Sequence, residues 1–236
     1  MSNPYFQFKQ FTVWHDKCAM KVGTDGVLLG AWTSVQGAHS ILDVGTGTGL
    51  VALMLAQRSL PNTNIVALEI DEAAAGQANE NIVRSPWKKQ IEVVQADFRK
   101  YQSPEKFDVI VSNPPYFVDS LGCPDQQRNS ARHNDSLTYE ELLEGVTGLL
   151  TENGTFTIVI PMDVADRVKM RAYDKKLQAV RQLNVITKPG GIPKRTLITF
   201  SFSNQECILE ELLTEVARHQ YSKEYIALTR EYYLNM

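Results

Sequence analysis

Residues 40–58, "SILDVGTGTGLVALMLAQR", decide the fold class of this chain. The first six are an apolar run typical of a buried strand, and residues 50–58 have the composition of a helix. Gly45, Gly47 and Gly49 separate the two and allow the backbone to turn sharply and to approach a ligand closely. This stretch therefore predicts a strand, a ligand-binding loop and a helix, in preference to a tight turn without a ligand.

The rest of the chain repeats this alternation of strands and helices. Further strands are predicted at residues 64–70, 91–97, 107–113, 154–161, 177–187 and 194–202. Further helices are predicted at residues 71–83, 138–150, 163–176 and 221–234. Such alternation predicts an α/β fold with a doubly wound, mostly parallel sheet, here of seven strands. The short loop between the last two strands excludes a parallel crossover, so we expect them to form an antiparallel pair at one edge.

Two other segments are less regular. Residues 5–14 alternate partly and predict a short β segment, and Thr24 or Asp25 is a candidate cap for a helix that ends at Leu29. Residues 207–215 have helical composition but are also consistent with an edge strand. In doubly wound sheets a ligand binds beyond the carboxyl ends of the strands, and the glycine loop falls there.

Composition and charge narrow the class of protein. The chain has 236 residues, of which 43% are hydrophobic and 22% charged, which is ordinary for one sizeable globular domain. The net charge of −3 argues against a uniformly basic nucleic-acid binder but allows a local basic patch. Three distant cysteines form neither a disulfide framework nor a zinc motif, and no apolar run is long enough for a membrane helix. We therefore expect a cytoplasmic protein with no bound metal and no membrane contact.

Acidic residues stand at the ends of the first three strongly predicted strands. Asp43 lies two residues before the glycine loop, where a buried carboxylate would disfavour a pyrophosphate and suit a cationic ligand. The loop has G-x-G-x-G spacing, with Leu50 where a dinucleotide fingerprint requires its third glycine. Glu69 can accept hydrogen bonds from both hydroxyls of a ribose. Asp97 can accept one from an adenine amine while the N–H of Phe98 donates to the ring, or it can cap a turn.

Four motifs carry a resemblance to a known class of enzyme. Together, "LDVGTGTG", "ALEID", "QADF" and "VSNPPY" resemble the class I S-adenosylmethionine-dependent methyltransferases that act on amino groups, which have a Rossmann-like fold. The resemblance covers residues 40–117 and implies that S-adenosylmethionine is the cofactor. It implies a methionine site of Asp43, Gly45, Gly47 and Gly49, a ribose contact from Glu69, an adenine site of Asp97 and Phe98, and a further cofactor contact from Ile70.

The NPPY motif, residues 113–116, follows the fourth strand of the sheet and suits methyl transfer to an amine. The lone pair of an exocyclic amine is delocalised, so it must be localised and aimed at the methyl group. The side-chain oxygen of Asn113 and the carbonyl of Pro114 can accept hydrogen bonds from the two N–H groups. Pro114 and Pro115 fix the backbone, so these acceptors are preorganised, and Tyr116 offers a face for stacking on a base. Methyl transfer of this kind requires no metal. The alternative interpretation of the NPPY motif is a proline-rich turn without a function.

The flanking sequences point to one family. The stretches "FKQFTVWHDKCAMKVGTDGVLLGAW", "NENIVRSPW", "PKRTLITFSF" and "YSKEYIALTREYYL" resemble the bacterial tRNA1(Val) adenine-37 N6-methyltransferases, and the match runs essentially end to end. The resemblance implies N6-methylation of an adenine next to the anticodon. It also implies that residues 15–25 fold over the methionine end of the cofactor, with Thr24 and Asp25 near it. We expect one domain, 1–236, in which 1–35 cover the cofactor site, 36–202 form the core sheet and 203–236 are a C-terminal extension.

Contact with tRNA requires local positive charge, and Arg132, Lys194 and Arg195 are the candidates. We expect a monomer. Two other functions remain open at this point. A protein glutamine N5-methyltransferase would use the same NPPY tip, and the net negative charge weakly favours it. A non-catalytic RNA-binding module on the same fold is the second alternative, although the acidic and NPPY residues are all intact.

Overall fold

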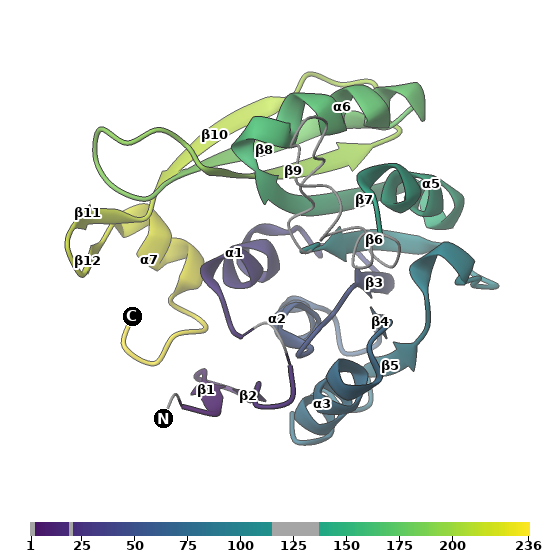
Figure 1. Cartoon of the computed structure of the whole chain (residues 1–236), viewed down its shortest axis with the longest axis horizontal. Helices are drawn as coiled ribbons and strands as arrows, with labels where there is room; N and C mark the ends of the chain where they lie inside the picture. Colours follow the sequence, from purple (N-terminus) through teal and green to yellow (C-terminus); the bar gives the residue numbers. More distant parts are fainter. Residues whose placement is uncertain (1–2, 19–20, 115–136) are drawn as a thin grey trace, which may run out of the picture.

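The computed structural model describes residues 3–18, 21–114 and 137–236, and Figure 1 shows their arrangement. A sheet of eight strands forms the centre, in the order β10-β8-β9-β7-β6-β3-β4-β5. Its strands are β3 (Ser40–Val44), β4 (Asn64–Glu69), β5 (Ile91–Gln95), β6 (Phe107–Ser112), β7 (Leu150–Pro161), β8 (Gln178–Ile186), β9 (Arg195–Ser201) and β10 (Ile208–Leu213). The expected α/β fold with a doubly wound, mostly parallel sheet is confirmed, although the sheet has eight strands where seven were predicted.

Helices cover both faces of this sheet. They are α1 (Thr24–Trp32), α2 (Leu50–Arg58), α3 (Glu72–Val83), α5 (Tyr139–Leu149), α6 (Ala165–Asp174) and α7 (Lys223–Thr229), with 3-10 turns at Phe98–Lys100 and Met162–Val164. Two hairpins complete the described chain: β1 (Tyr5–Gln7) with β2 (Thr12–Trp14), and β11 (Glu215–Ala217) with β12 (Gln220–Tyr221). Among the described residues, no helix is both long and apolar enough to cross a membrane.

Strand alternation divides the apolar side chains between two cores. Ile41 of β3 belongs to the core beneath α1 and α2, whereas its neighbour Leu42 belongs to the core beneath α5 and α6. Successive side chains of a strand point to opposite faces, so a sheet covered on both sides needs nearly continuous apolar runs. This requirement explains why "SILDV" contains so few polar residues.

The edge of the sheet at β10 differs from the expectation in two ways. Residues 208–213 form a strand that pairs in parallel with β8, which settles the open choice between helix and strand. The antiparallel pair of β8 and β9 is confirmed, but β9 lies between β8 and β7 and is not at the edge. The helical composition of this segment is overridden because Leu212 is buried in a core and the backbone of β8 gains a partner along its outer side.

Two helix boundaries also correct the sequence-based expectations. Helix α1 is capped by Gly23 without a side-chain hydrogen bond, so neither Thr24 nor Asp25 is the cap, and the helix runs on to Trp32. Helix α7 ends at Thr229, five residues before the predicted end. Beyond it the chain turns so that Tyr232 is buried and its carbonyl accepts a hydrogen bond from the N-terminal hairpin.

The strand directions gather the functional segments at one edge. Strands β3, β4, β5, β6 and β7 run parallel, and β9 runs against both β7 and β8. The carboxyl ends of β3 to β8 and β10 therefore share one edge with the start of β9. We refer to it as the carboxyl edge.

Candidate active site

The glycine loop opens the carboxyl edge at β3. Gly45, Gly47 and Gly49 have φ angles of 72°, 57° and 79°, in the left-handed region that favours glycine. A Cβ atom added to Gly45 or Gly47 would meet nothing within 4 Å, whereas one on Gly49 would lie 3.4 Å from Ala78 of α3. The first two glycines thus leave open space beside the loop, and the third allows α3 to pack closely.

Asp43 lies beneath this loop and is 1% exposed. Its Oδ2 atom accepts hydrogen bonds from Oγ1 of Thr46 at 2.6 Å and from the backbone N–H of Ala52 at 3.1 Å. Burial raises the pKa of Asp43 from its ordinary value of 3.8 to about 7, and the nearby Glu69 contributes in the same direction. A cation placed beside the loop would favour the ionised form of Asp43.

Glu69, at the end of β4, organises the backbone around it. Its carboxylate accepts hydrogen bonds from the N–H of Gly47 at 2.8 Å, of Ile70 at 3.0 Å and of Asp71 at 3.1 Å. A carboxylate has about four acceptor positions, so about one is left for a ligand hydroxyl in this arrangement. The side chain of Ile70 is 52% exposed next to it.

An N-terminal strap, residues 14–18, lies over α3 beside this region. The buried Asn81 of α3 accepts from the N–H of Trp14 and donates to the carbonyls of Trp14 and Thr48, each at 2.9 Å. One side chain thus ties the strap to the glycine loop. Sequence reasoning missed Asn81; the signal available for it was a polar residue on the inner face of an otherwise apolar helix stripe.

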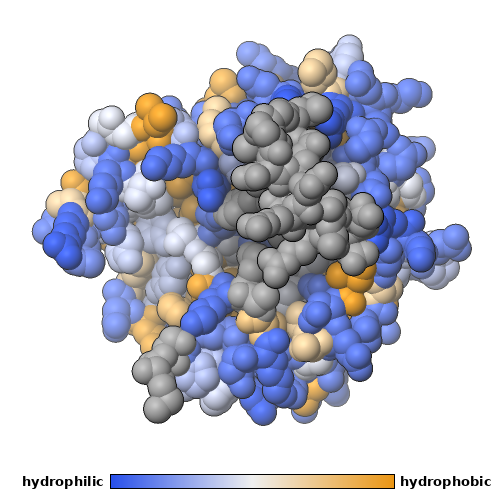
Figure 2. Space-filling model, in the orientation of Figure 1, coloured by the Kyte–Doolittle hydropathy of each residue, from blue (hydrophilic) through white to orange (hydrophobic). Residues whose placement is uncertain are grey.

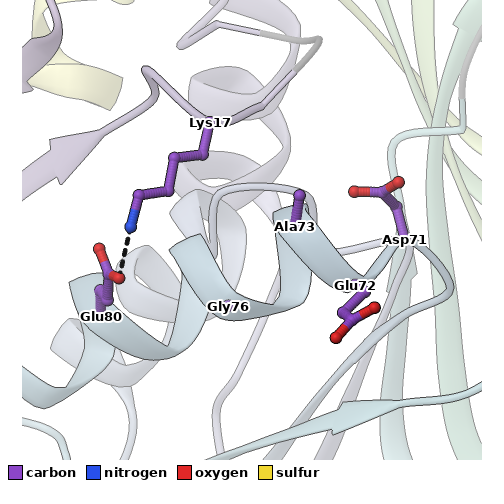
Figure 3. A pocket seen from close by; sticks show the side chains of 6 residues that line it. All are labelled: Lys17, Asp71, Glu72, Ala73, Gly76 and Glu80. Atoms are coloured by element: carbon purple, nitrogen blue, oxygen red, sulfur yellow. Dashed lines mark hydrogen bonds and ion pairs between the residues drawn. The ribbon is translucent and has the colours of Figure 1, made fainter.

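Figure 3 shows the open pocket beneath this strap, of about 550 Å³. The Nζ atom of Lys17 reaches down to Glu80 at 2.6 Å, and Asp71 lies at the start of α3, two residues after Glu69 in sequence. Cys18 belongs to the same surroundings, because burial and the charge of Glu69 raise its pKa to about 11. Residues 15–18, which the family resemblance places over the cofactor, therefore border the Glu69 region.

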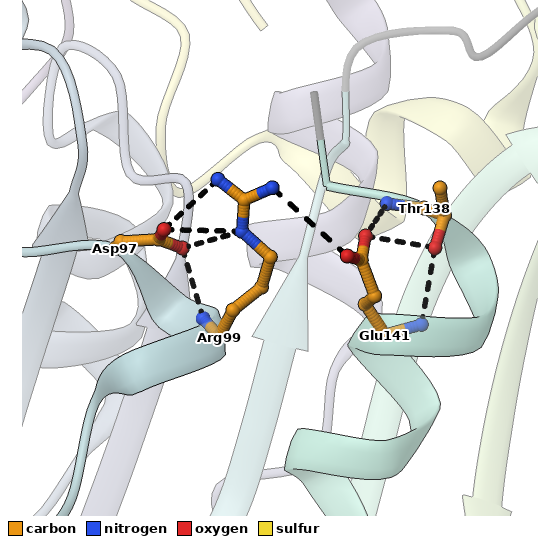
Figure 4. A network of polar contacts seen from close by, with 4 residues as sticks. All are labelled: Asp97, Arg99, Thr138 and Glu141. Atoms are coloured by element: carbon orange, nitrogen blue, oxygen red, sulfur yellow. Dashed lines mark hydrogen bonds and ion pairs between the residues drawn. The ribbon is translucent and has the colours of Figure 1, made fainter. Parts of the chain in front are cut away.

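Asp97 follows β5 at the same edge, within the network in Figure 4. It caps the 3-10 turn by accepting from the N–H of Arg99 at 3.0 Å, and it forms an ion pair with the Arg99 guanidinium at 2.9 Å. Hydrogen bonding to Arg99 holds the pKa of Asp97 below its ordinary value. Arg99 also approaches Glu141, which forms a capping box with Thr138 at the start of α5. The turn-cap reading of Asp97 is confirmed, and its contact with adenine stays a prediction.

Asn113 directly follows β6, which is paired with β3 so that Ser112 lies opposite Val44. Asn113 and the glycine loop therefore leave the sheet side by side. A Cβ atom added to Gly26 of α1 would lie 3.7 Å from Nδ2 of Asn113, so the start of α1 also borders this residue. Pro114 is buried. Pro115, Tyr116 and Arg132 lie outside the described residues.

The start of α1 also contacts β9. Nε of Arg195 donates to Oδ2 of Asp25 at 3.1 Å, which joins a residue expected at the cofactor to one expected at the RNA. Thr24 and Lys194 are exposed. Within the described part of the chain, no group of three or more His, Cys, Asp or Glu residues could hold a metal ion.

Comparisons with known proteins connect this geometry to a family. The family model "Methyltransferase small domain" matches residues 22–187. A tRNA1(Val) (adenine(37)-N6)-methyltransferase from Bacteroides thetaiotaomicron is 80% identical over 236 residues, which are 100% of each chain. One from Bacteroides fragilis is 67% identical, again over 100% of each chain. The crystal structure of a predicted O-methyltransferase from Agrobacterium tumefaciens has a TM-score of 0.68 at 17% identity, covers 90% of this chain and 100% of the other, and shows the fold alone.

Proposed function

We infer that this chain, which belongs to the tRNA1(Val) (adenine(37)-N6)-methyltransferase family, transfers a methyl group from S-adenosylmethionine to the N6 amine of adenine 37 in tRNA1(Val). One structural observation supports the assignment most directly. Asn113 and the glycine loop leave neighbouring strands in register, so a methyl donor at the loop and an amine at Asn113 would meet at the same edge.

The residues at the glycine loop fit S-adenosylmethionine. When bound, this cofactor supplies a methyl group that is activated by a positively charged sulfur. Asp43, ionised in the presence of the cationic cofactor, would provide negative charge beneath the loop, and the open space at Gly45 and Gly47 allows close approach of the backbone. Glu69 would accept from a ribose hydroxyl through its remaining acceptor position.

The adenine of the cofactor would lie between the ends of β4 and β5. Ile70 offers an exposed apolar surface there. Phe98 is fixed against α5, since a Cβ atom on Gly145 would lie only 2.4 Å from its ring. Asp97 would accept from the adenine amine while it keeps its bonds to Arg99. We assign Thr24 and Asp25, at the start of α1, to the methionine end of the cofactor.

The target amine would be held by the NPPY residues. The side-chain oxygen of Asn113 and the carbonyl of Pro114 would accept from its two N–H groups, which localises the nitrogen lone pair toward the methyl group. Once methylated, the nitrogen would be acidic and would lose a proton to water. We assign stacking on the base to Tyr116 and rigidity to Pro115. An anticodon-loop adenine is largely single-stranded, so its extrusion costs little.

Several finer assignments accompany this proposal. We assign RNA contacts to Arg132, Lys194 and Arg195, where Arg195 would exchange its partner Asp25 for a phosphate. The protein would act as a cytoplasmic monomer without a metal, and as the single domain described above. Light scattering of the purified protein tests whether it is a monomer, and metal analysis tests whether it binds a metal.

Asn113→Ala tests the proposed function. Removing one preorganised hydrogen-bond partner should slow methyl transfer by about 10²–10³ while cofactor affinity stays unchanged. The measurement is transfer of labelled methyl groups to tRNA, followed by nucleoside digestion and detection of N6-methyladenosine. Labelling of protein glutamine by the wild-type chain, or a wild-type rate in the variant, would overturn the assignment.

A further inference from the structure

A second surface at the carboxyl edge lies beyond the active site. It consists of the loop between β8 and β9, residues 187–194, and the hairpin β11–β12 with the residues that follow it, up to Lys223. The two parts are joined where the N–H of Glu215 donates to the carbonyl of Thr187 at 3.1 Å, and the adjacent bond from Thr214 to Ile186, at 2.8 Å, holds them together at their base. They lie together at the left of Figure 1. We refer to them as the lateral surface.

The lateral surface is basic although the whole chain carries a net charge of −3. Including Arg195, its two segments contain five Lys and Arg residues and a single acid, Glu215. Four of the five are exposed and have no ion pair or side-chain hydrogen bond within the described part of the chain: Lys188, Lys194, Arg218 and Lys223. Unpaired basic side chains on an acidic protein indicate a surface for an anionic partner.

The shape of the hairpin supports the same conclusion. Arg218 and His219 form its two-residue tip, and His219 adopts a left-handed φ of 62°. The ring of Tyr221 is 43% exposed and stacks on Tyr225 with centroids 5.1 Å apart. The same region of Figure 2 is mostly hydrophilic with scattered hydrophobic atoms. An exposed arginine at the tip and an amphipathic ring beside it suit a sugar–phosphate backbone better than an apolar partner.

The position of the surface identifies the part of the RNA that it would meet. Arg195 pairs with Asp25 at the start of α1, which borders Asn113, so the basic residues extend outward from the active site along the edge. A target base at Asn113 belongs to a loop, and a loop is joined to a stem. Double-stranded RNA is contacted mainly through its phosphates and 2′-hydroxyls.

We propose that the lateral surface binds the backbone of the RNA stem next to the target loop. This proposal rests on the proposed function, because it requires an RNA substrate at Asn113. It adds a second contact region that acts on RNA affinity and takes no part in methyl transfer.

The test is the double variant Arg218→Glu/Lys223→Glu. Its affinity for full-length tRNA, measured with demethylated cofactor present, should fall at least about tenfold, and the salt dependence of log Kd should lose a slope of about 2. The methylation rate at saturating tRNA and the cofactor affinity should stay at wild-type values. Lys223→Glu places an acid in the first turn of α7, which favours the helix, so unfolding would not explain the loss.

Lys88→Glu/Lys89→Glu is the matched control. Both lysines are exposed in the turn before β5, at the opposite edge of the sheet, and the change in net charge is identical. Equal loss of tRNA affinity in both double variants, or no loss in the first, would overturn the proposal. The proposal would also be overturned if the wild-type protein bound a single-stranded RNA of the loop sequence as tightly as an RNA hairpin that contains both stem and loop. If wild-type protein methylates no tRNA, the proposed function itself fails, which is a separate result.

Discussion

Asp43→Asn separates the stability of the fold from the binding of the cofactor. In the folded chain the pKa of Asp43 is about 7, against its ordinary value of 3.8. Between these values the unfolded chain binds fewer protons at this site than the folded chain, so the free energy of unfolding falls as pH rises. At 1.36 kcal/mol for each pKa unit, ionised Asp43 destabilises the folded chain by at most about 4 kcal/mol above pH 7.

The structure indicates that asparagine can replace Asp43 without losing its hydrogen bonds. Both bonds end on the same atom, Oδ2, which accepts from Thr46 and from Ala52. No hydrogen bond within the described residues ends on Oδ1, so the amide nitrogen can take that position. The stability of the variant relative to the wild type should therefore rise with pH, by about 2–3 kcal/mol between pH 5 and pH 8.

Urea denaturation of both proteins without cofactor, at pH 5 and pH 8, measures this difference. Calorimetry should show that the variant binds S-adenosylmethionine more weakly, with a smaller loss for the demethylated product, which lacks the sulfonium charge. Asp97→Asn is a control with the opposite pH dependence, because hydrogen bonding to Arg99 lowers the pKa of Asp97. The loss of folding stability in this variant should become smaller as pH falls. A stability difference for Asp43→Asn that is constant with pH, or largest at low pH, would refute the reasoning.

Four further substitutions test the packing and the cofactor contacts. Gly145→Ala should destabilise the chain by about 1–3 kcal/mol in thermal denaturation, because its Cβ would lie 2.4 Å from the ring of Phe98, whereas Gly148→Ala, with nothing within 4 Å, should stabilise it by about 0.5–1 kcal/mol. Glu69→Gln should weaken cofactor binding by about 1.5–3 kcal/mol in calorimetry, and wild-type affinity would speak against the ribose contact. Asn81→Leu should raise the KM for the cofactor more than it lowers kcat, since it releases the N-terminal strap from the glycine loop; an unchanged KM would leave that link without a role.

Much of the fold follows from local features of the sequence. Apolar runs and turn residues predicted seven strands and most helices, because burial on both faces of a sheet demands such runs. The three glycines predicted a sharply turning loop, and all three adopt left-handed φ angles, which glycine adopts without strain. Acidic residues at strand ends were also placed correctly at the carboxyl edge, because parallel strands bring their ends together.

The sequence alone thus determined features that are set within a few residues, namely strand periodicity, the sharp glycine turn and the order of the motifs. Tertiary structure decided whatever depends on partners distant in the chain. Residues 208–213 became a parallel edge strand because β8 offered a backbone partner. Arg195 paired with Asp25, 170 positions away, and Asn81 joined the strap to the glycine loop. No local pattern encodes such pairs, because their energies arise only when the sheet has brought both partners together.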